Sequence, residues 1–167
     1  LGVATRAVRI QVSAPDGAVA DAPVTARSGG QVYGAGRTDT NGVLECALPD
    51  GAYEIEVAAF GRPVQTARLK PAERGTLNIA CHAAGAVAAE IVDEHGAPSP
   101  CKVAFRGLGG TPDPYFFPET GERLVRNLLY SENGRFRQVV PPGEYEVVVT
   151  RGPECDAVIQ TLSIEPG

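Results

Sequence analysis

The sequence predicts an all-β protein made of two tandem antiparallel β-sandwich domains. Three observations predict this class. Gly (20) and Pro (14) make up about a fifth of the 167 residues, a frequency typical of short strands joined by tight turns. Apolar and polar residues alternate in several short runs, and no apolar 3.6-residue period persists for three turns. The third observation is an internal repeat, which sets the number of domains.

The repeat is clearest where a Pro-x-Gly turn leads into an alternating strand. Residues 49–57 read PDGAYEIEV and residues 141–149 read PPGEYEVVV. In both copies an Asn-Gly pair precedes this turn at the same spacing. Further upstream the second copy carries 13 extra residues, because its first turn glycine lies 38 residues before the Asn-Gly glycine instead of 25. We therefore expect domains at 1–82 and 83–167, with an insertion at 107–127 of the second.

Each copy is expected to begin with a strand that buries one face. Its alternating apolar residues are Val8, Ile10 and Val12 in the first copy and Val87, Ala89 and Ile91 in the second. Asn41-Gly42 and Asn133-Gly134 then predict hairpin turns, because both residue types tolerate positive φ. The later strands are expected at 43–48, 53–57, 66–69, 76–81, 136–140, 145–149 and 157–164. Residues 119–130 come nearest to a helix, with room for one short turn.

The string TDTNGVLECALPDGAYEIEVAAFGR resembles the carboxypeptidase regulatory-like domain, a transthyretin-like (prealbumin-like) sandwich, over most of residues 6–81. The second copy, from NLLYSENGRF to LSIEPG, is similar to the region that precedes the catalytic domain of bacterial PHP-type metallohydrolases of the CehA/McbA-like group. An aromatic residue is usual there at the position of Cys155. The resemblance implies an accessory region, with metal-binding histidines in a following H-x-H segment that this sequence does not contain.

Composition argues against several classes of function. The net charge is −5 and only two lysines occur, whereas nucleic-acid binding needs clustered Lys and Arg. No apolar stretch approaches the ~18 residues of a membrane span. The N-terminal residues LGVATRAVRI lack the charged and apolar regions of a signal peptide. We expect the sequence to be a part of a longer bacterial protein.

Residues for catalysis are scarce. The only histidines are His82, expected in the linker, and His95, expected in a turn, so we expect no metal site. No G-x-S-x-G motif is present, and the glycines of residues 107–110 lack the Lys-Ser/Thr of a phosphate-binding loop. Asp39, Asn41 and Asp50 fit hairpin turns better than a calcium loop. We therefore expect no catalytic residue and no cofactor.

The redox state of the four cysteines stays open. No Cys-x-x-Cys pair occurs among Cys46, Cys81, Cys101 and Cys155. They are either small buried apolar residues or disulfide partners. If bridges form, the simplest arrangement is one per domain, Cys46 with Cys81 and Cys101 with Cys155. An extracytoplasmic location, periplasmic or secreted, is favoured.

The insertion supplies the main candidate interaction residues. Its TPDPYFFP stretch sets Tyr115, Phe116 and Phe117 between prolines, beside Asp113. Because prolines hold the backbone extended, we expect some of these rings to face outward. Three interpretations remain open: a loop folded over its own sandwich, docking on a neighbouring domain, or stacking of a glycan or peptide on Tyr115.

A second candidate is the turn at residues 151–155, which presents Arg151 and Glu154 either to solvent or to a following domain. The favoured function is a non-catalytic structural and interaction module pair, the accessory region of a larger bacterial hydrolase. Its expected partner is a neighbouring domain of the same polypeptide, in particular a C-terminal catalytic domain. The alternative function is binding of a glycan or cell-surface polymer.

Overall fold

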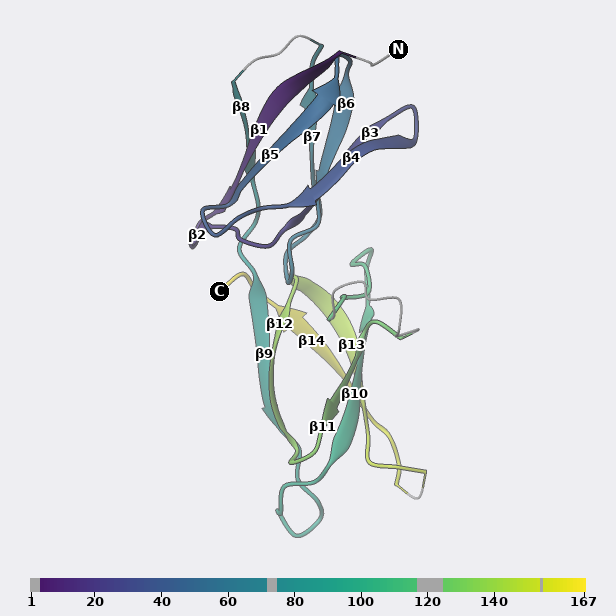
Figure 1. The fold of residues 1–167 in the computed structure, drawn as a ribbon. Coiled ribbons are helices and arrows are strands. Elements are labelled where there is room, and N and C mark those ends of the chain that lie inside the picture. Colours follow the sequence, from purple (N-terminus) through teal and green to yellow (C-terminus); the bar gives the residue numbers. More distant parts are fainter. Residues whose placement is uncertain (1–3, 72–74, 117–124, 154) are drawn as a thin grey trace. The chain divides into compact units, whose positions relative to one another are not determined.

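A computed structural model describes residues 4–71, 75–116, 125–153 and 155–167. All regular elements in these ranges are β-strands, and no helix occurs among them. The chain divides into two compact units, which we call unit 1 (Leu1–Ala83) and unit 2 (Ala84–Gly167) (Figure 1). The predicted all-β, sandwich class is confirmed.

Unit 1 consists of two facing sheets. The first sheet is built around a central strand, β1 (Thr5–Ala14). Its partners are β5 (Val43–Pro49) and β2 (Gly17–Ala18), which are antiparallel to it, and β8 (Thr76–Ala80), which is parallel. The second sheet has the order β4 (Gln31–Arg37), β3 (Pro23–Ser28), β6 (Tyr53–Val57) and β7 (Gln65–Leu69).

The core of unit 1 lies between these sheets and follows from the period of two. Along β1 every second side chain from Val8 to Val12 is buried, while Arg9 stays in solvent. Side chains from β8 and the residue after it complete the core. The buried residues are Val8, Ile10, Val12, Val19, Ala22, Val24, Ala26, Leu48, Tyr53, Ile55, Val57, Ala59, Leu69, Ile79 and Cys81.

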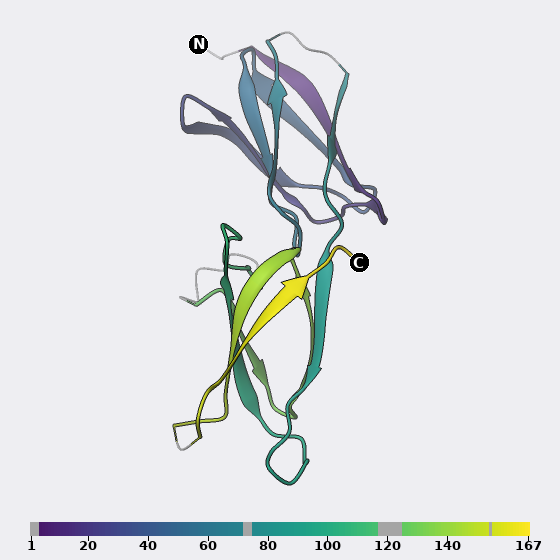
Figure 2. The same cartoon turned by 180° about the vertical axis from the view of Figure 1, so that it is seen from behind.

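Unit 2 repeats this plan with a smaller first sheet. Two antiparallel strands form it: β9 (Gly85–Glu90) and β12 (Arg135–Val140). The second sheet has the order β11 (Leu128–Ser131), β10 (Cys101–Gly107), β13 (Gly143–Thr150) and β14 (Val158–Ile164). Figure 2 shows β14 from behind, rising to the C-terminus beside the start of β9.

Aromatic rings fill the core of unit 2. Phe105 of β10 lies edge-on to Tyr145 of β13, with ring centroids 6.2 Å apart. Such edge-to-face pairs stabilise a core beyond the area that they bury. The buried residues of this core are Cys101, Val103, Phe105, Phe116, Leu129, Val140, Tyr145, Val147 and Ile164.

The matched turns of the repeat have matched structures. Gly42 and Gly134 adopt positive φ (74° and 72°), and a Cβ at either would lie 2.3 Å from a backbone oxygen of the neighbouring strand. Only glycine fits both positions. The Tyr53 hydroxyl donates to Pro49 O and the Tyr145 hydroxyl donates to Pro141 O, each at 2.9 Å. The Asn-Gly and Pro-x-Gly turns therefore have the same local structure in both units. Both Asn-Gly turns connect strands of different sheets, β4 to β5 and β11 to β12, so the hairpins predicted there do not form.

Two features of the strands were not predicted. β8 runs parallel to β1, because the chain crosses from the second sheet to the first between β7 and β8. The second is the short hairpin β3–β4, whose counterpart in unit 2 is the pair β10–β11, joined by residues 108–127. The proposed helical turn at 119–130 falls partly outside the described residues, and residues 128–131 form strand β11.

Candidate interaction surface

The insertion leaves β10 at Gly107 and is anchored at its base by Asp113. The Asp113 carboxylate accepts the backbone N–H of Gly107 at 2.8 Å and the side-chain amide of Asn127 at 3.4 Å. Asn127 also donates to Phe105 O. Asp113 is exposed, but its hydrogen-bonding capacity is used to close the loop. The structure therefore gives Asp113 a positioning role within unit 2.

Thr111 joins the same loop to the start of β13. The Glu144 N–H donates to Thr111 Oγ1 at 3.3 Å, and the Leu108 N–H donates to Glu144 O at 2.9 Å. The described part of the loop therefore folds back onto its own sandwich, where β10 ends and β13 begins, which agrees with one of the three interpretations left open.

Phe116 is a core residue, so its assignment as an outward contact is wrong. Its side chain is 4% exposed and meets Phe105 edge-on, with ring centroids 5.3 Å apart. The Phe116 N–H donates to Arg126 O at 3.0 Å, which ties the first arm of the insertion to the segment that leads into β11. The segment that Asp113 anchors to Gly107 therefore places the Phe116 ring in the core of unit 2.

Tyr115 remains at the surface, half-buried. The Arg126 guanidinium carbon lies 4.9 Å from its ring centroid, within the range of a cation–π contact. The exposed part of the Tyr115 side chain is what a ligand or a neighbouring domain could contact. Phe117, the third aromatic residue of the run, lies outside the described residues.

Arg151 lies at the other end of unit 2. It follows β13 directly, and its guanidinium is 3.7 Å from the carboxylate of Glu94, in the turn after β9. Glu154 lies outside the described residues. The eight residues of β13 span about 25 Å, so Arg151 is too far from the insertion to share a ligand with Tyr115.

Sequence reasoning missed a second exposed tyrosine and an exposed apolar pair. Tyr130 of β11 is 64% exposed, with the Lys102 ammonium 5.5 Å from its ring centroid. Val158 and Ile159 of β14 are 54% and 62% exposed. Alternation along LLYS places Tyr130 on the outer face, and that signal was present in the sequence. For β14 no such signal existed, because its pattern fits either face.

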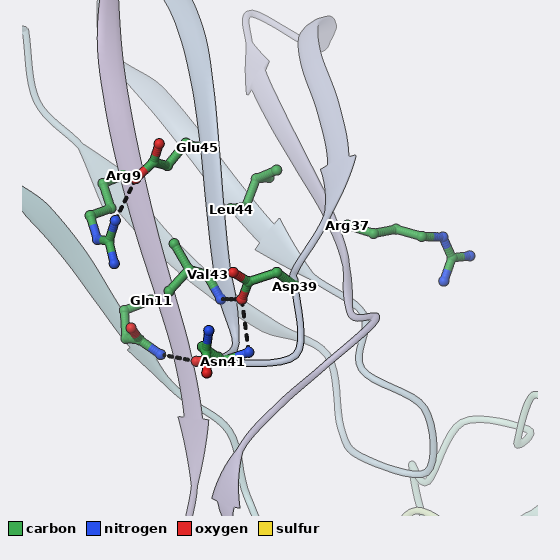
Figure 3. Close-up of a pocket in the computed structure, with 8 residues that line it drawn as sticks. All are labelled: Arg9, Gln11, Arg37, Asp39, Asn41, Val43, Leu44 and Glu45. Carbon is green, nitrogen blue, oxygen red and sulfur yellow. Dashed lines mark hydrogen bonds and ion pairs between the residues drawn. The ribbon is translucent and has the colours of Figure 1, made fainter.

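Unit 1 has a shallow, open pocket of about 560 Å³ (Figure 3). The Asp39 carboxylate accepts the N–H groups of Asn41 and Val43, and Gln11 donates to Asn41 O. These bonds shape the turn between β4 and β5, so Asp39 has the expected role in a turn, but the two strands belong to different sheets and form no hairpin. Arg37 points away, toward Asp21, with a nitrogen–oxygen distance of 3.1 Å. The pocket walls are therefore held by their own polar contacts. Its lining residues are Arg9, Gln11, Arg37, Asp39, Asn41, Val43, Leu44 and Glu45.

No group of three or more His, Cys, Asp or Glu side chains converges as a metal site within the described ranges. His95 is exposed in its turn, and its imidazole lies 3.9 Å from the adjacent Glu94. In the same ranges no helix is long and apolar enough to cross a membrane. The expected absence of a metal site therefore stays a prediction.

All four cysteines are free thiols, so neither conditional disulfide forms. Cys81 and Cys101 are buried in the two cores, Cys46 is half-buried, and Cys155 is exposed. Burial raises the pKa of the Cys46, Cys81 and Cys101 thiols, which keeps them protonated and unreactive at neutral pH. These three residues act as small apolar side chains.

Comparison with known proteins supports the fold. No family model and no curated protein matches the sequence. A streptococcal ancillary pilin shares 16% identity with a TM-score of 0.50; the match covers 95% of this chain and 59% of the pilin. A shaft pilin from Lactobacillus rhamnosus GG shares 12% identity with a TM-score of 0.48, covering 98% and 95% of the two chains. At this low identity, the similarity to the streptococcal ancillary pilin shows a shared β-sandwich fold. The chain spans less than two thirds of the length of that streptococcal pilin.

Proposed function

We propose that this chain is a non-catalytic structural and interaction module pair within a longer bacterial protein. Its units are of the carboxypeptidase regulatory-like, transthyretin-like type, and its partner is a neighbouring domain of the same polypeptide. The observation that carries the proposal is that the polar side chains at the base of the insertion hydrogen-bond within unit 2. Asp113, Asn127 and Thr111 are all engaged in holding the loop, which presents Tyr115 and Arg126 on a rigid base.

A rigid aromatic–arginine pair is well suited to a protein interface. Tyr and Arg are enriched among the residues that contribute most to binding, and a prearranged pair loses little side-chain entropy on docking. The finer assignment, an accessory region of a metallohydrolase, rests on the resemblance of residues 127–167. An extracytoplasmic location is part of the same proposal and agrees with the name of the streptococcal ancillary pilin whose fold is similar.

The test is a binding measurement between this chain and the adjacent domain of its polypeptide, produced separately. Tyr115→Ser is expected to weaken the complex about tenfold or more in isothermal titration calorimetry. Phe116 is unsuitable for this test, because its replacement opens the core. Tyr130→Ser is the matched control: it also removes an exposed tyrosine beside a cation, Lys102, but at the other end of β10. Equal effects of both variants, or no effect of Tyr115→Ser, contradict the docking surface.

Catalysis and polymer binding are tested on the purified chain. We expect no hydrolysis of esters, phosphates or peptides, and no retention on glycan arrays or cell-wall polymers. Hydrolysis that survives repurification contradicts the non-catalytic proposal. Retention that Tyr115→Ala abolishes favours the polymer-binding alternative.

A further inference from the structure

The first strands of the two units differ in how their edges are paired. In unit 1, β1 pairs with β5 along one edge and with β8 along the other. The Val12 N–H donates to Gly42 O on the first side, and the Cys81 N–H donates to Ser13 O on the second. The backbone groups of β1 are therefore satisfied on both sides by strands of its own unit.

In unit 2, β9 pairs only with β12 among the strands that the structure describes. The repeat aligns Val8 with Val87 and Val12 with Ile91. The unit 1 side chains are 4% and 0% exposed, whereas their unit 2 counterparts are only half-buried. No described strand of unit 2 occupies the place of β8, so the apolar face of β9 is incompletely covered.

The direction of the backbone identifies the open groups. The Ile91 N–H donates to Gly134 O, and therefore points toward the β12 side of the sheet. Backbone groups alternate along a strand, so those of Ala88 and Glu90 point to the opposite edge. By the alignment these two residues match Arg9 and Gln11, which pair with Thr76 and Asn78 of β8.

The sequence of β9 does not protect this edge. Exposed edge strands are usually guarded by lysine, proline, a bulge or an inward-pointing charge. Residues 85–90 read GAVAAE, with small apolar side chains and one charge at the end. A strand of this kind is a template for pairing unless another strand covers it.

The geometry at the end of β14 indicates where a covering strand enters. The Gly167 N–H donates to Ala84 O at 3.0 Å, directly before β9. In unit 1 the chain leaving β7 lies at the corresponding place, where Lys70 O accepts the Arg6 guanidinium at 2.9 Å. From there the chain of unit 1 continues into β8, parallel to β1.

We propose that an extended segment of the same polypeptide, joined to unit 2 through Gly167, fills the open edge of β9. It runs parallel to β9, bonds to Ala88 and Glu90, and alternates apolar and polar side chains as Thr76–Ala80 does. This inference rests on the proposed function, in which the units belong to a longer polypeptide, and it names the backbone contact through which unit 2 joins its neighbour.

The test adds the missing strand to the whole chain. The sequence ERGTLNIAS, which is residues 73–81 with Cys81→Ser, is attached after Gly167. The connector from Ile164 to the first residue of the new strand then equals that from Leu69 to Thr76. Hydrogen exchange of Ala88 and Glu90 is expected to slow about tenfold or more. Ala89, whose N–H points toward β12, serves as the internal reference, and the thermal midpoint of unit 2 is expected to rise.

Two controls make the result decisive. An extension carrying Leu77→Ser and Ile79→Ser keeps the length but loses the apolar side chains, and is expected to give no protection. Unchanged exchange with ERGTLNIAS, or equal protection by the serine control, overturns the proposal. Equal protection by the free ERGTLNIAS peptide at micromolar concentration overturns the proposal that the covering strand comes from the same polypeptide. Attachment gives an effective concentration in the millimolar range, so an attached strand is expected to protect far better than the free peptide. These readouts are independent of the docking and hydrolysis tests, so either proposal can fail alone.

Discussion

Unit 1 and unit 2 share one template but close their cores in different ways. Unit 1 completes its first sheet with β8, and joins β3 to β4 by a tight hairpin. Unit 2 has no described counterpart of β8, and replaces the hairpin with the insertion that brings Phe116 into the core. One end of the core of unit 2 is thus sealed by an extra aromatic residue, while the edge of β9 stays open.

The comparison shows which parts of a sandwich tolerate change. The turns around Gly42 and Gly134 are the same because a backbone oxygen leaves no room for a Cβ. Loop length and edge strands differ, since an added loop costs little entropy once its base is anchored and an edge strand can come from elsewhere in a chain. Differences at edges and loops are therefore where the distinct role of unit 2 is expected.

The largest predicted effect concerns the aromatic seal of unit 2. Phe116→Ala is expected to cost about 3–5 kcal/mol in the free energy of unfolding of unit 2, because it leaves a cavity against Phe105. Urea denaturation followed by amide NMR separates the two units and checks this. Tyr115→Ala, one residue away and half-buried, is the control, with an expected cost below about 1 kcal/mol. A small cost for Phe116→Ala means that the insertion does not seal the core.

The next effect compares the first strands directly. Val8→Ala is expected to cost about 2 kcal/mol, because Val8 is enclosed by both sheets, and Val87→Ala about half as much. The same NMR-detected denaturation measures both changes. Equal costs at the two positions argue that the apolar face of β9 is as well covered as that of β1.

A smaller and equal effect is expected at the matched tyrosines. Tyr53→Phe and Tyr145→Phe each remove a hydroxyl that donates to a proline carbonyl at 2.9 Å. Each loss is expected to cost about 1 kcal/mol in its own unit. Because burial, and then the nearby Asp113 carboxylate, raise the pKa of Tyr145, its hydroxyl keeps its proton at neutral pH. Thermal unfolding of the single variants checks whether the two costs are equal. A cost in only one unit would show that the two tyrosines do not have equivalent roles.

The smallest effect is electrostatic and specific to unit 1. The Asp16 carboxylate accepts two hydrogen bonds from Arg62, at 2.6 and 2.8 Å, which lower the pKa of Asp16. A carboxylate with a lowered folded-state pKa stabilises the fold above its unfolded pKa, and this contribution disappears as the pH falls through the folded pKa. The counterpart of Asp16 in unit 2 is His95, so unit 2 has no carboxylate at this position.

Arg62→Gln is expected to raise the pKa of Asp16 toward its ordinary value in a carbon-13 NMR titration. Asp93 is the control, because its pKa is lowered first by the backbone N–H of Ala97 and then by that of His95, and neither bond involves Arg62. An unchanged Asp16 titration in the variant would show that the ion pair does not persist in solution.

Most of the strand positions could be predicted from the sequence, but the pairing of strand edges could not. The Asn-Gly turns and the matched tyrosine strands were predictable because they depend on local backbone geometry. That the Asn-Gly turns cross between sheets instead of closing hairpins was not predicted. The parallel pairing of β8 was not, since alternation in Thr76–Ala80 identifies a strand but not the sheet that it joins. Nor was the open edge of β9 predicted, although the replacement of the bulky Ile10 by Ala89 is a visible hint.

The candidate site was predicted in location more than in detail. Proline and aromatic content drew attention to the insertion, but neither the burial of Phe116 nor the bond from the Gly107 N–H to Asp113 could be predicted, because both join residues that the sequence does not pair. Asp113 itself was proposed as an interaction residue and is engaged in loop closure. The half-buried Tyr115 remains a proposed contact, with Arg126 as a partner that sequence reasoning did not identify.

Hydrogen exchange of the unmodified chain tests the central difference between the units most directly. Amide protons of Arg9 and Gln11 face β8, whereas those of Ala88 and Glu90 face the open edge of β9. The account predicts strong protection of the first pair and exchange near the unprotected rate for the second. Equal, strong protection of both pairs would contradict it, because β9 would then already have a partner on that edge.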